Sequence, residues 1–309
     1  MHRSFARSLL SRSRIFASVL TANRALLLIL VLSVSAAPDI HAQDYVQVAP
    51  VPGAVRTRIT VVNALLGATI GGARAWIRHR PIRRGLALGA LGGLTTAGAR
   101  QVVATRRDGA GIFGRVLHDV GLGLGSAASD SMLTIPFHVG PLVARWAPAT
   151  RSWPSVRVNL TNLVYAGVAI AQIDGRVDWR STLWSGAVTV LPGVNVSPDY
   201  PQAAPGTIAL TDVSSLCGVS PSGASICRVD LAHESIHVLQ LDMMHEWVGK
   251  DIEAALVRRL PGVRGISRWV EVGAVGPGTV AFLQARRPYH TRWIEYEAFW
   301  LTEGAGAPP

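Results

Sequence analysis

The chain has little charge, and what it has is unevenly distributed. Lys250 is its only lysine, so the formal net charge of +11 comes almost entirely from arginine. Glutamate does not occur before Glu234, and all seven Glu residues lie between that position and Glu303. Only 16% of the residues are charged and 49% are hydrophobic, a composition that excludes intrinsic disorder for most of the chain and provides a sizeable core.

Cysteine is rare as well. Cys217 and Cys227 are the only two, and neither belongs to a CxxC or CxxH pattern, which argues against a cysteine-based metal site. The residues between them are rich in Gly, Ser and Pro. In an oxidising compartment we therefore expect these two cysteines to form a disulfide that closes a small loop.

Residues 1–42 have the pattern of a targeting segment. Several arginines precede an uncharged apolar run over residues 25–38, and Ala42 closes a possible cleavage site. The run is short for a membrane-spanning helix, which needs about 20 residues, so we expect a cleaved signal peptide, with an N-terminal anchor as the alternative. Either assignment predicts export to the periplasm or cell envelope.

Arginine dominates the region that follows. Residues 43–115 contain eleven Arg against only Asp44 and Asp108. This excess indicates either an anionic membrane surface as partner or a compositional bias that replaces Lys by Arg. Because export is predicted, we expect a membrane rather than nucleic acid. The charge asymmetry also indicates two functional halves, residues 43–150 and 151–309.

Two Gly- and Ala-rich stretches, residues 59–73 and 85–99, predict a pair of helices. Gly85, Gly89 and Gly93 follow the small-xxx-small spacing that lets helix backbones approach closely. The pair is either buried in a soluble domain or embedded in, or lying on, a membrane. Residues 111–126 continue the same composition and do not decide between these alternatives.

The hydrophobic pattern changes after residue 150. Residues 156–160 alternate between apolar and polar, and Asp174-Gly175 is the turn pair of a two-residue hairpin. We expect strands in the stretches 156–160, 168–173, 176–180, 188–191 and 207–211. Together they predict an antiparallel β meander over residues 155–212.

The last third of the chain has helical patterns. We expect one helix to begin after Asp230 as N-cap, to continue to Trp247 and to stop at Gly249. Further helices are predicted at residues 251–260 and 291–300. The predicted fold class is therefore α+β, with a Gly- and Arg-rich helical part, a β meander and C-terminal helices.

The first of these helices contains the sequence His233-Glu234-Ser235-Ile236-His237. Residues four apart lie on one face of a helix, so His233 and His237 can offer two imidazole nitrogens to one Zn²⁺ ion. Glu234 would then be the general base that takes a proton from water. The alternative is a pair of hydrogen-bonded core histidines without metal.

A third protein ligand is needed for a catalytic zinc site. A metzincin pattern would need Gly at position 240 and His at position 243, where this chain has Gln240 and Met243. The final helix offers a better candidate in the sequence EYEA, residues 295–298. HESIHVLQ and EYEA together resemble the two zinc-binding segments of gluzincin peptidases, and residues 43–200 resemble no family.

The resemblance implies Glu295 as third ligand, with Ala298 three residues later on the same face. Many gluzincins have Asp after this Ala, where this chain has Phe299. Glu297 is the alternative ligand, and the remaining acidic candidates are Asp251, Glu253 and Glu271.

Two further groups of polar residues lie near these segments. Tyr289, His290 and Tyr296 are close in sequence to Glu295, and a Tyr or His donor there can stabilise an oxyanion, although such residues more often serve packing. His245 and Glu246 repeat a His-Glu pair without a second His. We expect this pair at a helix end or on the surface.

The sequence thus predicts an exported, membrane-associated zinc peptidase that acts on a peptide or protein substrate. Two alternatives remain open. The first is a non-catalytic envelope protein that keeps a zincin-like helix pair as a scaffold. The second is a lipid-binding or membrane-structural protein in which residues 43–150 carry the function.

Overall fold

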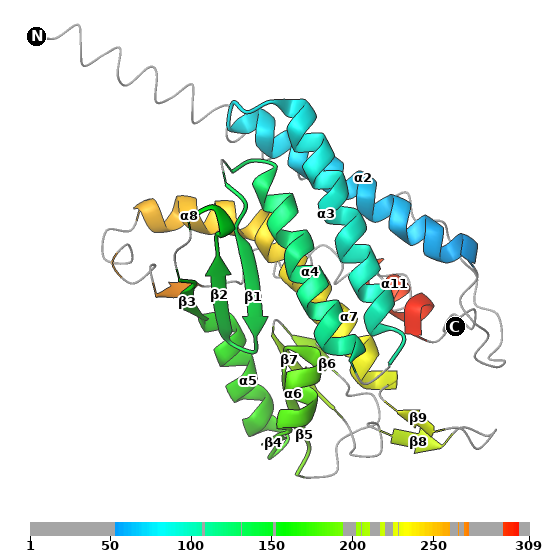
Figure 1. The fold of residues 1–309 in the computed structure, drawn as a ribbon. Coiled ribbons are helices and arrows are strands. Elements are labelled where there is room, and N and C mark those ends of the chain that lie inside the picture. The colour runs from blue at the N-terminus through cyan, green and yellow to red at the C-terminus, as the bar shows by residue number, and fades with distance from the viewer. Residues whose placement is uncertain are drawn as a thin grey trace, which may run out of the picture.

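The computed structural model describes most of the chain from residue 53 onward (Figure 1). The described residues are 53–106, 109–130, 132–150, 153–193, 202–204, 206–210, 217–219, 225–227, 229–259, 265, 269–271 and 293–302. The predicted targeting segment, residues 1–42, lies outside them. The described part is an α+β fold, as the sequence predicts.

Three helices form a layer: α2 (Gly53–Ile77), α3 (Ile82–Val103) and α4 (Ala110–Ala127). α3 packs against α2 along one side and against α4 along another (Figure 1). The helices predicted at residues 59–73 and 85–99 are therefore confirmed, and residues 111–126, which continue the same composition, lie in a helix as well. Among the described residues, no helix is long and apolar enough to cross a membrane.

Glycine allows α2 and α3 to pack backbone against backbone. A Cβ atom on Gly67 would lie 2.2 Å from the carbonyl oxygen of Gly89, and one on Gly71 would lie 2.4 Å from that of Gly85. A Cβ on Gly93 would lie 2.1 Å from a carbonyl oxygen of α2. Any larger residue would push the two backbones apart, so the small-xxx-small spacing determines this helix contact.

A second set of helices comes from the last third of the chain. α7 (Val229–Met244) lies behind the helical layer, and α11 (Trp293–Thr302) packs along it (Figure 1). The predicted stop at Gly249 is wrong. One π-helical turn, His245–Gly249, instead leads directly into α8 (Lys250–Arg259). The side chains of this turn are largely buried, and their packing outweighs the low helix propensity of glycine.

Two small mixed sheets complete the fold. The first has the order β1-β2-β3-β10, with the strands Ile135–Val139, Leu142–Trp146, Ser155–Asn159 and Val270–Glu271. The second has the order β4-β5-β7-β6, with the strands Arg176–Val177, Val188–Leu191, Thr207–Ala209 and Gln202–Ala204. In each sheet one pair is parallel, β3 with β10 and β5 with β7.

The predicted antiparallel meander over residues 155–212 is therefore wrong, although its strands at residues 155–159, 188–191 and 207–209 exist. Two helices interrupt it, α5 (Leu160–Gln172) and α6 (Trp179–Ser185). The Asn159 side chain accepts a hydrogen bond from the backbone N–H of Asn162, and this N-cap ends β3 and starts α5. Asp174 does have a positive φ of 45°, but it follows a helix and does not join two strands.

A hairpin of β8 (Cys217–Val219) and β9 (Ser225–Cys227) lies beyond the sheets. Its antiparallel register puts Cys217 directly opposite Cys227. The disulfide between them remains a prediction.

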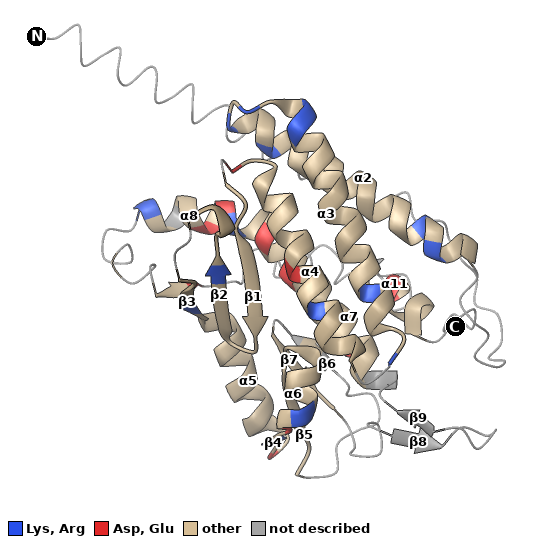
Figure 2. Ribbon diagram, viewed as in Figure 1, with Lys and Arg blue, Asp and Glu red and all other residues tan. Residues whose placement is uncertain are grey.

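Ion pairs join the two compositional halves of the chain, and Figure 2 marks where the basic and acidic residues lie on the helices. Arg74 of α2 pairs with Asp251 of α8 at 2.9 Å, and Arg115 of α4 pairs with Asp242 of α7 at 2.5 Å. Strand β2 also pairs with β3 across position 150. The separation of arginine from acidic residues along the sequence thus becomes charge complementarity between packed helices.

Candidate metal centre

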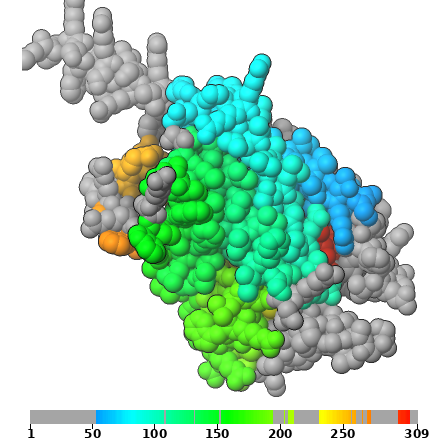
Figure 3. Space-filling model, in the orientation of Figure 1, coloured from blue at the N-terminus to red at the C-terminus, as the bar shows by residue number. Residues whose placement is uncertain are grey.

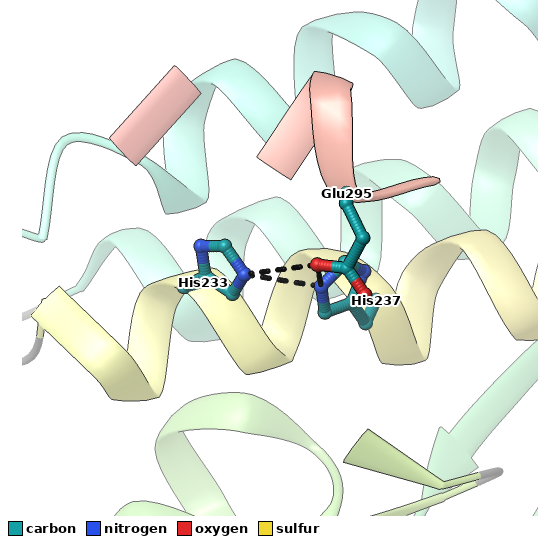
Figure 4. A group of neighbouring side chains, drawn as sticks. All are labelled: His233, His237 and Glu295. Atoms are coloured by element: carbon teal, nitrogen blue, oxygen red, sulfur yellow. Dashed lines mark hydrogen bonds and ion pairs between the residues drawn. The ribbon is translucent and has the colours of Figure 1, made fainter. Parts of the chain in front are cut away.

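The HExxH sequence lies on α7, as the pattern predicts, and its side chains are buried. His233 and His237 are one turn apart and are only 5% and 6% exposed. Glu295 enters from the first turn of α11 and is 6% exposed. The three side chains point toward one another from the two packed helices (Figure 4).

The donor atoms of these three residues converge. The Nε2 atoms of His233 and His237 are 3.1 Å apart, and Glu295 Oε2 lies 3.0 Å from His237 Nε2 and 3.6 Å from His233 Nε2. Ligands of a tetrahedral zinc with bonds of 2.0 to 2.1 Å would be about 3.3 Å apart. The three separations are therefore close to the edge lengths of one face of the zinc coordination tetrahedron.

The outer nitrogen of His237 is held by a buried chain of hydrogen bonds. Its Nδ1 lies 3.1 Å from Oε1 of Gln240, whose amide nitrogen donates to Glu297 Oε2 at 2.9 Å. A carboxylate only accepts, so the amide group of Gln240 must face Glu297 and its oxygen must face the histidine. His237 Nδ1 therefore carries the hydrogen, and Nε2 keeps its lone pair for a metal.

Glu297 is thus not one of the three converging residues, and it supports Gln240 behind His237. Arg100 Nε donates to its Oε1 at 2.9 Å, and the Asn63 amide donates to the same oxygen at 3.3 Å. Arg100 also donates to the Asn63 side-chain oxygen at 2.6 Å. Through these contacts α2 and α3 fix the carboxylate that orients Gln240.

His233 is oriented in a similar way. Its Nδ1 lies 3.3 Å from the hydroxyl of Thr302, which itself donates to the Ala298 carbonyl at 2.8 Å. The hydroxyl hydrogen is used in that bond, so the oxygen accepts from Nδ1 and leaves His233 Nε2 as an acceptor. Phe299, at the position where many gluzincins have Asp, packs edge-on against the His233 ring at 4.6 Å.

Three acceptor atoms therefore face one another in a buried space, where a cation can bind between them. Burial would lower the pKa of His237, but the hydrogen bond and charge of Glu295, with the charge of Glu234, raise it to about 9. A proton on His237 is one such cation. A divalent metal at the same point would satisfy all three acceptors together, so the residues present fit zinc.

Glu234 is buried beside these residues at 4% exposure, and its negative charge contributes to the raised pKa of His237. It is not one of the three converging groups. Of the other residues that the sequence indicated, Tyr296 is half-buried against Trp300, with burial raising its pKa. Tyr289 and His290 lie outside the described residues.

The remaining acidic candidates for third ligand do not converge with His233 and His237. Asp251 pairs with Arg74. Glu253 lies on α8 and is not among the three converging residues. Glu271 lies in a second buried group with His245 and Glu246. That His-Glu pair follows the end of α7, one of the two expected positions, but the expected surface exposure is wrong, since both residues are at most 3% exposed.

This second group differs from the first because a cation is already in place. The Arg145 guanidinium donates to both oxygens of Glu271 at 2.7 Å and to the two oxygens of Glu246 at 2.5 and 3.2 Å. Burial opposes these charges, but Arg145 lowers the pKa of Glu246 well below its usual range. All four carboxylate oxygens accept from one arginine, so this group is an ion-pair network rather than a metal site.

The HExxH and ExxA spacing predicts the three converging residues but not their supports. Gln240 differs from the metzincin pattern at its position, and neither Thr302 nor Arg100 belongs to a motif. Comparison with known proteins gave no family model, no curated protein and no solved structure that matches this chain.

Proposed function

We propose that the protein is an exported zinc-dependent metallopeptidase of the gluzincin type. His233, His237 and Glu295 would be the zinc ligands, and Glu234 the general base. The observation that carries the proposal is the convergence of three buried acceptor atoms whose tautomers and orientation are fixed by neighbouring side chains. The HExxH and ExxA segments support a peptide or protein as substrate, because gluzincin peptidases bind their zinc through these two segments.

Each side chain has a defined task in this mechanism. When bound, zinc supplies Lewis acidity, which makes a nearby water acidic enough to lose its proton near pH 7. Glu234 is buried beside the ligands and accepts that proton. Gln240 and Thr302 keep the hydrogen of each imidazole on Nδ1, so that both Nε2 atoms remain acceptors.

Metal analysis of protein purified from the exported fraction tests the site. We expect close to one zinc per chain, and loss of that zinc in His233→Ala and in His237→Ala. His79→Asn is the matched control, because His79 is exposed and its φ of 55° is one that Asn tolerates. Full zinc content in either site variant would overturn the proposal.

Activity is tested separately, with an unfolded protein such as casein as substrate. Glu234→Gln keeps the size of the side chain and should keep zinc, but it should lower the hydrolysis rate by roughly 10²- to 10⁴-fold through loss of the general base. Equal, negligible rates for the wild-type protein and Glu234→Gln, both with zinc bound, would instead favour the non-catalytic scaffold.

A further inference from the structure

The outward sides of α2 and α3 expose an unusual number of large apolar side chains. Leu65 is 63% exposed and Trp76 is 60% exposed, values that belong to a surface residue rather than a core residue. Both helices share this property, with Val61, Val62, Leu65 and Trp76 on α2 and Ile82, Leu86, Leu91 and Leu94 on α3. We call these eight residues, together with Arg80, Arg83 and Arg84, the α2–α3 outer face.

The charge of these helices has one sign only. Residues 53–103 contain no Asp or Glu. Arg74 and Arg100 are buried in ion pairs with acidic residues of the C-terminal helices, so they are not available to a partner. The remaining arginines lie mainly at the turn between α2 and α3 and at the start of α2 (Figure 2).

Of the arginines at the turn, Arg80, Arg83 and Arg84 are exposed and have no ion pair with the described residues. Arg78 differs, since it pairs with Asp130 and Asp251. Three uncompensated cations therefore border a surface of exposed leucine, isoleucine, valine and tryptophan. In Figure 3 the two helices form the upper right border of the molecule.

We propose that the α2–α3 outer face docks on the surface of an anionic lipid bilayer. Apolar side chains on an amphipathic surface enter the boundary between headgroups and acyl chains, while arginines bind the lipid phosphates. Nucleic acid would use the arginines but would leave the leucines in water. The combination of both features on an acid-free pair of helices is what selects a lipid surface.

A second apolar surface of the fold has no charged residues. α5 exposes Leu163 and Val164, among others, but residues 160–172 contain no charged residue. It therefore has the apolar part of a lipid-binding surface without the cationic part. Substitutions at Leu163, and at the exposed Trp179 of α6, serve as controls for the loss of exposed apolar area.

Docking in this way would place the membrane close to the candidate metal centre. The inward sides of α2 and α3 provide Asn63 and Arg100, which hold Glu297 behind His237. The α2–α3 outer face is thus on the opposite side of the same two helices. A helix is about 10 Å across, so the two surfaces are separated by roughly one helix diameter.

Vesicle flotation of the exported protein tests the proposal. One set of vesicles is phosphatidylcholine alone, and in the other a third of the lipid is phosphatidylglycerol, each at low and high salt. We expect strong binding to the anionic vesicles at low salt and weak binding in the other conditions, because screening weakens the contribution of the arginines. Equal binding to both kinds of vesicle would overturn the proposal.

Two pairs of substitutions separate the contributions. Arg83→Gln with Arg84→Gln should lower the partition coefficient roughly 25-fold, because each basic residue contributes about 1 kcal/mol near such a surface. Leu65→Ser with Trp76→Ser should lower it roughly tenfold or more through loss of apolar burial. All four residues are exposed, so the fold should be retained.

The controls make the same chemical changes elsewhere. They are Arg176→Gln with Arg180→Gln, and Leu163→Ser with Trp179→Ser, all at exposed positions. Residues 1–52 are the same in every variant, so any difference reports on the substituted surface. Loss of binding in the controls to the same extent would overturn the proposal. A third outcome would also overturn it: the Arg83/Arg84 variant loses binding while the Leu65/Trp76 variant binds as before. That pattern indicates a surface that binds polyanions in general.

Discussion

Arg100 donates its Nε hydrogen to Glu297 at 2.9 Å, although 197 positions separate the two residues. Both side chains are buried, and the contact joins α3 to α11. Glu297 in turn holds Gln240, which orients His237. The Gly- and Arg-rich helices therefore belong to the support of the candidate metal centre.

The Arg100–Glu297 pair can be measured through stability. In metal-free protein, Arg100→Met should lower the free energy of unfolding by about 3 to 5 kcal/mol, because it leaves the Glu297 carboxylate buried without a counter-charge. The double variant Arg100→Met/Glu297→Gln should recover more than half of that loss. Urea denaturation measures both, and Arg83→Met, at an exposed position, is the control, with an expected change within about 0.5 kcal/mol. Equal losses in the single and double variants would contradict the interpretation.

Zinc affinity distinguishes the ligand Glu295 from the supporting residue Glu297. We expect Glu295→Gln to lower the affinity more than 100-fold, because one of three protein ligands is lost. The fold-preserving variant Arg100→Met/Glu297→Gln should lower it by about 10- to 100-fold, the usual effect of losing a group behind a ligand. Competition with a chelator measures both affinities. The reverse order would reassign the third ligand to Glu297.

Thr302 gives a test that depends on a single hydroxyl group. Thr302→Val keeps the shape of the side chain but removes the oxygen that accepts from His233 Nδ1, so zinc affinity should fall about 10- to 100-fold. Thr95→Val is the matched control, because Thr95 makes the same bond to the carbonyl four residues earlier and has no contact with the site. An equal change in the two variants would mean that the hydroxyl acts on the helix rather than on His233.

Local patterns in the sequence predicted the parts of the site that depend on spacing within one helix. His233 and His237 are four residues apart, and Glu295 lies in a short segment with a family resemblance. The supporting residues could not be predicted in this way. Arg100, Gln240 and Glu297 come together only because α3, α7 and α11 pack against one another, and no local pattern encodes that packing.

The errors in the fold have a similar cause. Residues 160–172 are uncharged and largely apolar, so they suit a strand as well as a helix, and the Asn159 N-cap decides between them. The arginine excess in residues 43–115 predicts an anionic partner or a compositional bias. It does not predict that Arg74, Arg100 and Arg115 pair with acidic residues far along the chain, because those contacts depend on how the helices pack.

The Arg145 network predicts how stability responds to acid. Burial raises the pKa of both Glu246 and Glu271, but Arg145 lowers that of Glu246 below the ordinary value of 4.5, and His245, 3.7 Å away, together with Arg145 lowers that of Glu271. Groups with a lowered folded-state pKa stabilise the protein above their unfolded pKa, and this contribution is lost as the pH falls below about 4.5. We therefore expect the free energy of unfolding to decrease steeply from pH 5 downward.

The contribution of Arg145 is isolated by comparison with Arg145→Lys. Lysine keeps the charge but cannot donate to four carboxylate oxygens, so the decrease in unfolding free energy between about pH 5 and pH 3 should be smaller in this variant. Urea denaturation of metal-free protein at several pH values measures it. Arg180→Lys, at an exposed position, should behave as the wild type. Parallel curves for Arg145→Lys and the wild type would show that other carboxylates cause the acid response.

The β8–β9 hairpin sets the geometry for the last prediction. Cys217 and Cys227 are directly opposite in an antiparallel pair, where Cα atoms are about 4.5 to 5.5 Å apart. Disulfides occur at Cα separations of about 4.4 to 6.8 Å, so the backbone register is compatible with the bond.

We therefore expect protein from the exported fraction to contain the Cys217–Cys227 disulfide. Mass spectrometry after alkylation, with and without reductant, should show no free thiol before reduction and two afterwards. In the chain-entropy estimate, a disulfide that closes a loop of this length contributes roughly 3 kcal/mol to the free energy of unfolding. The variant Cys217→Ser/Cys227→Ser should therefore have a lower urea midpoint than the wild type. Reductant should lower the midpoint of the wild type to that of the variant. Two free thiols in freshly isolated protein would contradict both the bond and the predicted export, because an oxidising compartment is the condition on which the bond depends.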